Sequence, residues 1–243
     1  MIADAGHSVL WNTHAISVGM KSKGTLVART VSRFVLGFLI GSALLFVPAG
    51  SLHFWHAWIF VIGYLGIWIV FSFLLLKWDP QLMERRLQYK EAEPEQRLFQ
   101  KLWALLFPAL ALPRFDFRFH WSKVPVWLAV TAQAMMMVSS LLIFWVLRTN
   151  TFAGRIIHVE SGQEVITTGP YAIVRHPMHA GILLTLLAIP LALGSYLAHP
   201  FFLVLVLLIL FRLIHEERNP RRDLPGYEDY CLHTRFRLVP GFW

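Results

Sequence analysis

Long apolar runs separated by short polar and basic segments dominate the chain. The clearest runs cover residues 34–48, 54–76, 126–147 and 181–214. The last run is too long for one crossing of a bilayer core of about 30 Å, and Pro200 lies near its middle. We therefore expect two helices there, with a break near His199 and Pro200. The pattern predicts an all-α integral membrane protein that ends in a helical hairpin.

A shorter apolar run, residues 98–112, decides how many times the chain crosses the membrane, because Pro108 interrupts it. If this run crosses, only three of the 22 Lys and Arg residues lie on the far side, namely Arg114, Arg118 and Lys123. Cytoplasmic segments are enriched in Lys and Arg. We therefore expect about six transmembrane helices, one of them short, with both termini cytoplasmic.

The composition agrees with this architecture. Of 243 residues, 56% are hydrophobic and only 15% are charged, whereas a soluble domain carries about 25% charged residues. The single cysteine, Cys231, excludes an intramolecular disulfide. The net charge is +8. The basic residues lie between apolar runs rather than along one helix face, so we expect no nucleic-acid partner. The longest polar stretch, residues 78–100, is predicted to be a cytoplasmic loop.

Two polar segments flank the predicted hairpin. The first, residues 167–181, contains an Arg-His-Pro sequence, and its Pro177 suits the first turn of a helix. The second, residues 212–218, contains Arg212 and the pair Glu216 and Glu217. A hairpin returns both of its ends to one membrane surface, so these segments should become neighbours. A cation, imidazoles and carboxylates would then surround one pocket, and the helix start would attract an anionic group.

Other chemistries fit the sequence less well. His176, His179, His215 and Glu216 could offer metal ligands, but Pro177 disturbs regular helical presentation and no His-Glu-x-x-His sequence occurs. We expect no metal site. The chain also lacks a glycine-rich nucleotide loop and a Gly-x-Ser-x-Gly nucleophile elbow.

These segments resemble the isoprenylcysteine carboxyl methyltransferase family and, more loosely, the phospholipid N-methyltransferases and membrane thiol methyltransferases. The matching residues are Gly169-Pro170-Tyr171, Arg175-His176-Pro177, Gly181, Arg212, Glu216-Glu217, Pro225 to Tyr230 and Arg235 to Pro240. The chain departs from the family pattern at two places. His179 stands where the family usually has Tyr, and residues 219–224, with Pro220, replace a more regular helix.

The resemblance implies S-adenosylmethionine as cofactor, with S-adenosylhomocysteine as product, in a pocket at the cytoplasmic surface. Carried over by position, the cofactor-binding residues would be Gln163, Glu164, Val165, Ile166, Tyr171, His176, Pro177, Met178, His179, Glu216 and Glu217. Arg212 and Glu216 would be the catalytic pair, with Arg212 orienting an anionic acceptor. This divides the chain into a tail (1–30), N-terminal transmembrane helices (31–147) and a cofactor-binding catalytic region (148–243).

The implied activity is methyl transfer to a lipophilic acceptor, either a small molecule or a lipid-anchored group, that enters sideways from the membrane lipids. The resemblance is greatest to carboxyl O-methylation of a prenylcysteine. Phospholipid N-methylation and thiol S-methylation are alternatives. Two further alternatives are an NADPH-dependent sterol-type reductase and a non-catalytic membrane scaffold or transporter. Transport is less favoured because the polar residues gather at helix ends rather than at membrane depth.

Overall fold

The computed structural model describes residues 23–87, 106–150, 165–216 and 226–242. Within these ranges the chain is helical or irregular and contains no strand. The elements are α1 (Lys23–Ala49), α2 (Trp55–Ile59), the π-helix η1 (Phe60–Leu65), α3 (Gly66–Trp78), α4 (Pro80–Leu87), α6 (Leu106–Phe119), α7 (Val126–Thr149), the 3₁₀ turn η2 (Gly169–Ala172), α8 (Pro177–Ala192), α9 (His199–Glu216) and α11 (Tyr227–His233).

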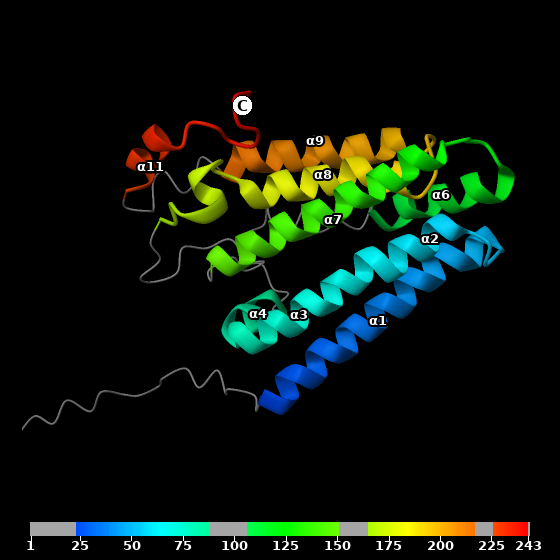
Figure 1. Cartoon of the computed structure of the whole chain (residues 1–243), viewed down its shortest axis with the longest axis horizontal. Helices are drawn as coiled ribbons and strands as arrows, with labels where there is room; N and C mark the ends of the chain where they lie inside the picture. Colours follow the sequence, from blue (N-terminus) through cyan, green and yellow to red (C-terminus); the bar gives the residue numbers. More distant parts are fainter. Residues whose placement is uncertain (1–22, 88–105, 151–164, 217–225, 243) are drawn as a thin grey trace, which may run out of the picture.

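The long helices run side by side as a bundle (Figure 1). Three of them are long and apolar enough to cross a membrane, namely Gly24–Ala49, Trp55–Trp78 and Val126–Thr149. Two shorter apolar helices, Pro177–Ala192 and His199–Ile214, lie beside them. A helix satisfies its own backbone groups, which a hydrocarbon environment requires. The all-helical prediction is therefore confirmed for the described residues, and the exact number of crossings stays a prediction.

The C-terminal hairpin forms as expected, with its break directly before His199. Helix α8 ends at Ala192, and Gly194 adopts a positive φ of 74° in the turn that follows. Helix α9 then begins at His199, so Pro200 lies in its first turn. A proline is tolerated there because the first N–H groups of a helix have no intrahelical acceptor. The predicted break near His199 and Pro200 is therefore confirmed, although Pro200 lies in the first turn of α9 and not in the turn itself.

Two other polar or interrupted segments also contain helix. Residues 98–105 of the expected apolar run 98–112 lie outside the described ranges, and the rest of the run opens α6 at Leu106. Pro108 therefore lies in the first turn of α6. The stretch 78–100, predicted as a loop, begins with α4, whose Leu82, Met83 and Leu87 are buried.

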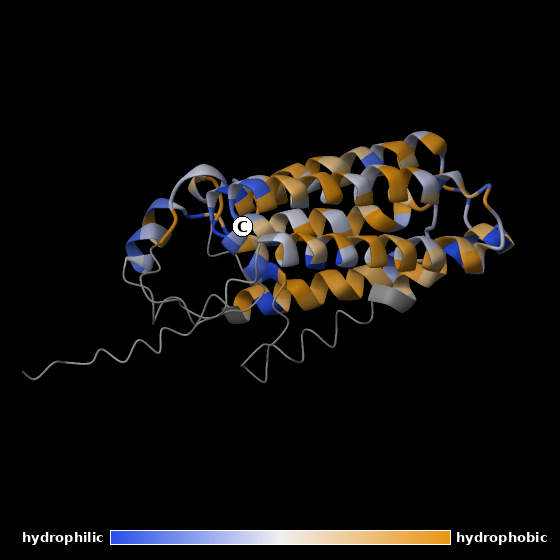
Figure 2. Ribbon diagram, turned by 90° about the horizontal axis from the view of Figure 1, so that it is seen from below, coloured by the Kyte–Doolittle hydropathy of each residue, from blue (hydrophilic) through white to orange (hydrophobic). Residues whose placement is uncertain are grey.

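The two ends of the bundle differ in polarity. One end gathers η2, α11 and α4 with the start of α8 and the end of α9 (Figure 1). Hydrophilic residues concentrate at this end, while the helix bodies are mostly hydrophobic (Figure 2). We call it the polar end. The sidedness of the termini stays a prediction.

The opposite end is closed by a buried carboxylate. Asp116, 1% exposed, accepts hydrogen bonds from the backbone N–H of Ser122 at 2.6 Å and from its hydroxyl at 2.6 Å. The hydroxyl of Ser195 also donates to Asp116. This network joins the end of α6 to the turn of the α8–α9 hairpin.

Close packing between α7 and α8 sets the position of the hairpin. A Cβ atom on Gly181 would meet Ile143 Cγ1 at 2.5 Å, so only glycine fits this contact. The hydroxyl of Ser139 donates to the Gly181 carbonyl at 2.5 Å and shares a hydrogen bond with Thr185 at 2.6 Å. Small residues allow helices in a membrane to approach closely and to hydrogen-bond across the contact.

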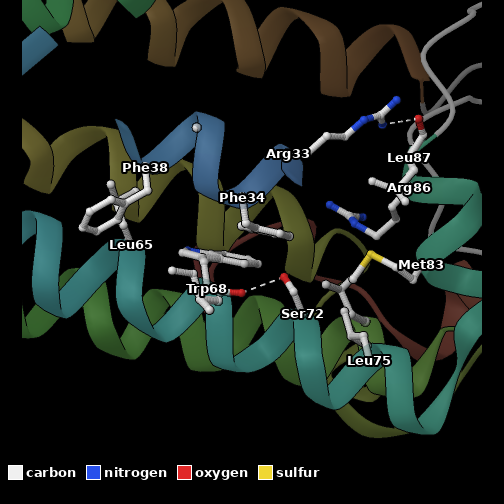
Figure 3. Close-up of a pocket in the computed structure, with 13 residues that line it drawn as sticks. Arg33, Phe34, Phe38, Leu65, Trp68, Ser72, Leu75, Met83, Arg86 and Leu87 are labelled. Atoms are coloured by element: carbon white, nitrogen blue, oxygen red, sulfur yellow. Dashed lines mark hydrogen bonds between the residues drawn. The ribbon is translucent and has the colours of Figure 1, made fainter. Parts of the chain in front are cut away.

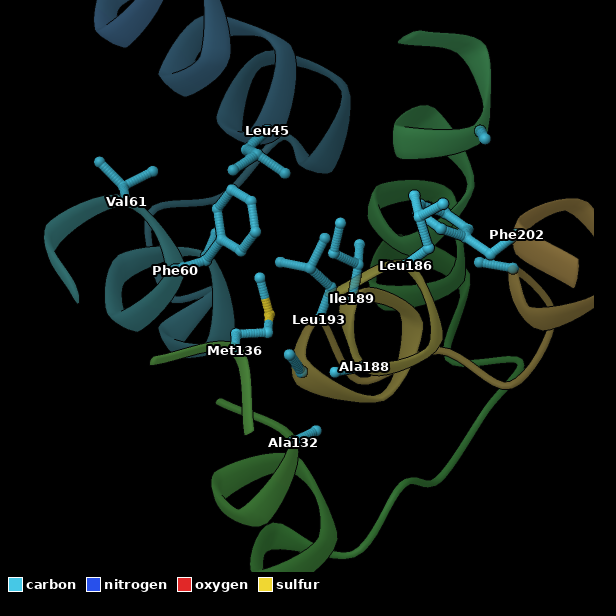
Figure 4. Close-up of a cluster of buried hydrophobic side chains, with 14 of the residues drawn as sticks. Leu45, Phe60, Val61, Ala132, Met136, Leu186, Ala188, Ile189, Leu193 and Phe202 are labelled. Atoms are coloured by element: carbon cyan, nitrogen blue, oxygen red, sulfur yellow. The ribbon is translucent and has the colours of Figure 1, made fainter. Parts of the chain in front are cut away.

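The main hydrophobic core lies next to this contact and joins several helices. Leu45 of α1, Phe60 of η1, Met136 of α7 and Ile189 of α8 meet there (Figure 4). The core therefore fixes the hairpin against the N-terminal helices as well as against α7.

Candidate active site

The entry to α8 begins with η2, which is fastened to the end of α7. Gly169 has a positive φ of 59°, and a Cβ atom there would lie 2.9 Å from the hydroxyl of Thr149. The neighbouring Pro170 is buried. A left-handed backbone and a close approach to α7 both require glycine at this position. The turn predicted at Gly169 and Pro170 is thus present and is anchored to a transmembrane helix.

Tyr171 is held from two sides. Asn150 Nδ2 donates to the Tyr171 hydroxyl at 3.0 Å, and the Tyr230 hydroxyl donates to the Tyr171 carbonyl at 2.8 Å. Burial raises the pKa of Tyr171, against the opposing effect of the Asn150 hydrogen bond. Burial likewise raises the pKa of Tyr230 to about 12. Both phenols are therefore protonated at neutral pH, and the ring of Tyr171 has a fixed orientation.

The C-terminal tail pairs with the Arg-His-Pro segment. The backbone N–H of Arg175 donates to the Phe236 carbonyl at 2.9 Å, and the N–H of His176 donates to the Arg237 carbonyl at 2.9 Å. The Arg175 guanidinium donates to the Arg235 carbonyl at 3.1 Å and to Cys231 Sγ at 3.5 Å. These hydrogen bonds hold the tail beside the start of α8. The Arg175 side chain therefore holds the tail in place beside α8.

The start of α8 carries four of the predicted cofactor residues. His176 precedes the helix, and Pro177 occupies its first turn. The rings of His176 and His179 lie edge to face with centroids 5.8 Å apart. Met178 packs against a second hydrophobic cluster, which includes Met83 and Leu87 of α4. The imidazoles therefore lie together at the polar end, while Met178 faces the N-terminal helices.

The remaining predicted residues are only partly described. Val165 and Ile166 are half-buried and lead irregularly into η2. Arg212 lies in the last turns of α9, at the same end of the bundle as η2 and the start of α8. Glu216 closes α9, but its side chain lies outside the described residues. Gln163, Glu164 and Glu217 also lie outside the described residues.

Two cavities open between α1 and the rest of the bundle, beside this end. The first has a volume of about 380 Å³ and the second of about 470 Å³. Both volumes fall within the range of about 300–1,000 Å³ that is typical of ligand sites. Both are lined by Gly37, Leu65, Trp68 and Arg86. The second cavity is also lined by Met178, so it reaches the predicted cofactor residues.

The sequence did not predict the two arginines of these cavities. Arg33 and Arg86 line the first cavity, and Arg86 also lines the second (Figure 3). Arg212 lines neither of them. In the sequence both residues are ordinary basic residues beside apolar runs. One signal in the sequence could have pointed to Arg86. The helical spacing of Leu82, Met83 and Leu87 is typical of a helix that buries one face, and Arg86, four residues after Leu82, lies on that face.

A comparison with protein families decides the class of this arrangement. The model of the phospholipid methyltransferase family matches residues 124–221. The matched residues, which make up less than half of the chain, are similar to this family, and we call them the phospholipid methyltransferase domain. This family includes the isoprenylcysteine carboxyl methyltransferases, so the resemblance stated from the sequence is confirmed. No curated protein gives a significant match to the chain.

The phospholipid methyltransferase domain contains α7, η2, α8 and α9, and therefore the whole hairpin with both of its polar ends. The family implies a membrane methyltransferase. Helices α1 to α6, which contribute Arg33 and Arg86, precede the matched residues. Within the described residues, no group of three His, Cys, Asp or Glu side chains could hold a metal ion.

Proposed function

We propose that the chain transfers a methyl group from S-adenosylmethionine to a lipophilic acceptor at the membrane surface and releases S-adenosylhomocysteine. One observation carries this proposal. A cavity open to the lipid-facing side reaches Met178, at the polar end of the phospholipid methyltransferase domain. An apolar acceptor and a polar cofactor could therefore meet at the start of α8.

The described residues fit such a cofactor. Tyr171, His176 and His179 offer aromatic surfaces for an adenine ring, and Val165 and Ile166 lie beside them in sequence. The first turn of α8, opened by Pro177, presents backbone N–H groups that favour a carboxylate. Glu216, with Glu217 and the segment of Gln163 and Glu164, would contact the cofactor's amino and ribose groups. When bound, the cofactor supplies an electrophilic methyl group on a sulfonium.

The chain's own contribution is positioning and exclusion of water. The tail fastened by Arg175 covers the entry to α8, and the fixed Tyr171 ring orients what packs against it. Holding two reactants in line supplies much of the rate of a displacement reaction. Arg212, at the same end of the bundle, would orient an anionic acceptor. A carboxylate or thiolate acceptor needs no general base once it is ionised, whereas a protonated amine does.

Two acceptor classes have specific support. The residues shared with isoprenylcysteine carboxyl methyltransferases favour a prenylcysteine carboxylate. The description of the matched family favours a phospholipid amine. Both have long apolar chains that suit the cavities beside α1.

The decisive experiment incubates the purified protein with radiolabelled S-adenosylmethionine and extracted host lipids, and identifies methylated products by mass. Calorimetry with S-adenosylhomocysteine and with NADPH separates a methyltransferase from a reductase. We expect Glu216→Gln to weaken binding of S-adenosylhomocysteine and Arg212→Ala to lower turnover. Arg118→Ala, an exposed arginine at the opposite end, is the matched control. Normal binding and turnover in both site variants would refute the assignment.

A further inference from the structure

The C-terminal tail contains a tight turn formed by Val239, Pro240, Gly241 and Phe242. The backbone N–H of Phe242 donates to the Val239 carbonyl at 3.2 Å, and Gly241 has a positive φ of 82°. A proline followed by a left-handed glycine is the arrangement of a type II β-turn. Proline fixes its own φ and glycine adopts the left-handed conformation without strain. The turn is therefore preformed and loses little conformational freedom when it binds a partner.

The apolar side chains of this turn are exposed. Phe242 is 88% exposed and Val239 is 52% exposed, and Phe236, three residues before Val239, is exposed as well. Thr234 and Leu238, which alternate with them along the tail, are buried. One side of the tail therefore packs against the protein, and its outer side carries two phenylalanines and a valine. Exposed apolar groups that gather on an ordered backbone mark an interaction surface.

The same segment is basic. Residues 232–242 contain Arg235 and Arg237 and no acidic residue. The Arg235 side chain is exposed, while its carbonyl accepts the hydrogen bond from Arg175. The acidic residues of this region lie earlier, in the first turn of α11. The outer side of the tail therefore combines aromatic and cationic groups, which complement an apolar surface that is rimmed by negative charge.

The position of the tail in the bundle suits a membrane partner. Figure 1 shows the chain ending beside the polar end of α9, on the side of the bundle away from α1. The outer face of α9 stays apolar almost to its end, since Phe211 is 64% exposed and Ile214 is 46% exposed. Side chains of this kind on an apolar membrane helix face hydrocarbon chains. The tail therefore lies close to the boundary between hydrocarbon and water, where interfacial segments bury aromatic groups and extend arginines to the headgroups.

We propose that residues 235–242 dock onto the anionic headgroup surface of the surrounding bilayer. Phe236, Val239 and Phe242 insert at the acyl-chain boundary, and Arg235 contacts lipid phosphates. The lipids are a docking surface here and not a substrate. Docking holds the outer side of the tail, while the hydrogen bonds to the segment before α8 hold its inner side. The tail follows the residues that the family model matches, so that match does not assign this surface.

Site-directed spin labels measure the depth of the tail. The full chain with Cys231→Ser, which keeps an acceptor for Arg175, receives one new cysteine by Phe242→Cys and a nitroxide label. It is reconstituted, one copy per disc, in nanodiscs of an equimolar mixture of phosphatidylcholine and phosphatidylglycerol. Collisions with oxygen, which enters the bilayer, and with a water-soluble nickel complex report the surroundings of the label. The matched control carries the label at α11 through Glu228→Cys. We expect an oxygen-to-nickel collision ratio several times higher for the label that replaces Phe242.

The contribution of charge is tested in the labelled chain. Arg235→Gln changes only the side chain, so the hydrogen bond from Arg175 to the Arg235 carbonyl stays. One basic residue contributes about 1 kcal/mol to binding an anionic membrane surface, so the ratio of docked to free label should fall about fivefold. Nanodiscs of phosphatidylcholine alone should lower this ratio at least as much. Lys123→Gln is the matched control, because Lys123 is exposed at the opposite end of the bundle, and should leave the ratio unchanged.

The contribution of the apolar contact is tested without a label. Trypsin cleavage after Arg237 is followed by mass in the anionic nanodiscs. Phe242→Ser should be cleaved about tenfold faster than the wild-type chain, because burial of a phenylalanine side chain contributes about 1.5 kcal/mol or more. Thermal unfolding of each variant shows whether it is folded.

Three results would overturn the proposal. A label replacing Phe242 that meets nickel as often as the label replacing Glu228 lies in water. A label shielded from both probes lies against protein instead of lipid. An oxygen-to-nickel ratio that is equal with and without phosphatidylglycerol shows that anionic headgroups do not hold the tail. No cofactor is present in these experiments, so failure of the proposed methyl transfer would appear in the turnover experiment and not in these.

Discussion

The contact between Gly181 and α7 offers a sharp test of how the active site is positioned. In Gly181→Ala the new Cβ atom would lie 2.5 Å from Ile143 Cγ1 and 3.1 Å from Cδ1, whereas ordinary contacts begin at 3.4 Å. Rotation about χ1 of Ile143 would move Cγ1, but a β-branched residue in a helix strongly prefers one χ1 rotamer, so we expect α7 and α8 to separate by about 0.9 Å in a close-packed interior. Separation also lengthens the hydrogen bond from Ser139 to the Gly181 carbonyl.

Overpacking of this kind costs about 1–3 kcal/mol, which corresponds to a fall in Tm of about 2–12 °C for a chain of this size. Because α8 carries His176 and His179 at its start, we also expect weaker binding of S-adenosylhomocysteine. The assays are thermal unfolding in detergent and calorimetry. Gly66→Ala is the control, since nothing lies within 4 Å of its Cβ position and alanine favours a helix.

A double-mutant cycle with Ile143→Ala isolates the contact. Ile143→Ala removes the clashing atoms, so the double variant should lose at least about 1 kcal/mol less than the sum of the single losses. If Gly181→Ala unfolds at the wild-type temperature, the helices have room between them and the geometric reasoning is refuted.

Three further predictions concern the two ends of the bundle. Asp116→Ala leaves the donors of Ser122 and Ser195 without their acceptor, so Tm should fall as expected for about 1–3 kcal/mol per buried group, while cofactor binding measured by calorimetry is retained. Gly169→Ala, strained at a φ of 59° and crowded by Thr149, should weaken S-adenosylhomocysteine binding more than Gly226→Ala, which is strained at 82° but uncrowded. Tyr230 should keep its proton up to about pH 12 in the folded protein. A free tyrosine ionises near pH 10, so the contribution of Tyr230 to stability is complete below pH 10 and is lost as the pH rises toward 12. An ultraviolet difference titration of wild type against Tyr230→Phe should show no ionisation of this phenol at pH 10.5.

The helices of the hairpin could be predicted from sequence because apolar residues continue over their whole length. The break near His199 could also be predicted, but the residues that form the turn could not. Composition points to Pro200 as a helix breaker, whereas the turn depends on the positive φ of Gly194 and on the buried Ser195 that bonds to Asp116. Both features depend on tertiary contacts with another part of the chain. A proline within an apolar run is also suited to the first turn of a new helix.

The candidate site divides in the same way. The placement of the Arg-His-Pro segment and the end of α9 at one end of the bundle followed from the hairpin alone. The hydrogen bonds from Arg175 to the tail could not be predicted in this way. They join Arg175 to the Cys231 thiol, 56 positions away in sequence, and to the Arg235 carbonyl, 60 positions away. The arginines of the two cavities were missed because the burial of one face of α4 depends on its packing with α3, α1 and α7 in one hydrophobic cluster. The roles of the individual cofactor residues stay predictions.

Under the proposed function, the matched domain would bind the cofactor, and the N-terminal helices would bind the acceptor. The family model matches α7, α8 and α9, and His176 and His179 lie within the matched residues. The C-terminal tail lies outside them but hydrogen-bonds to Arg175 and His176. Helices α1 and α4 supply the arginines that line the two cavities, and Met178 and Ile182 of α8 line the second cavity. Under the proposed function, changes in the N-terminal helices would alter acceptor binding and leave cofactor binding intact, except at the residues of α8 that line the second cavity. A substitution at Arg86 should alter which lipid binds and leave S-adenosylhomocysteine affinity unchanged, whereas a substitution at Met178 should affect both.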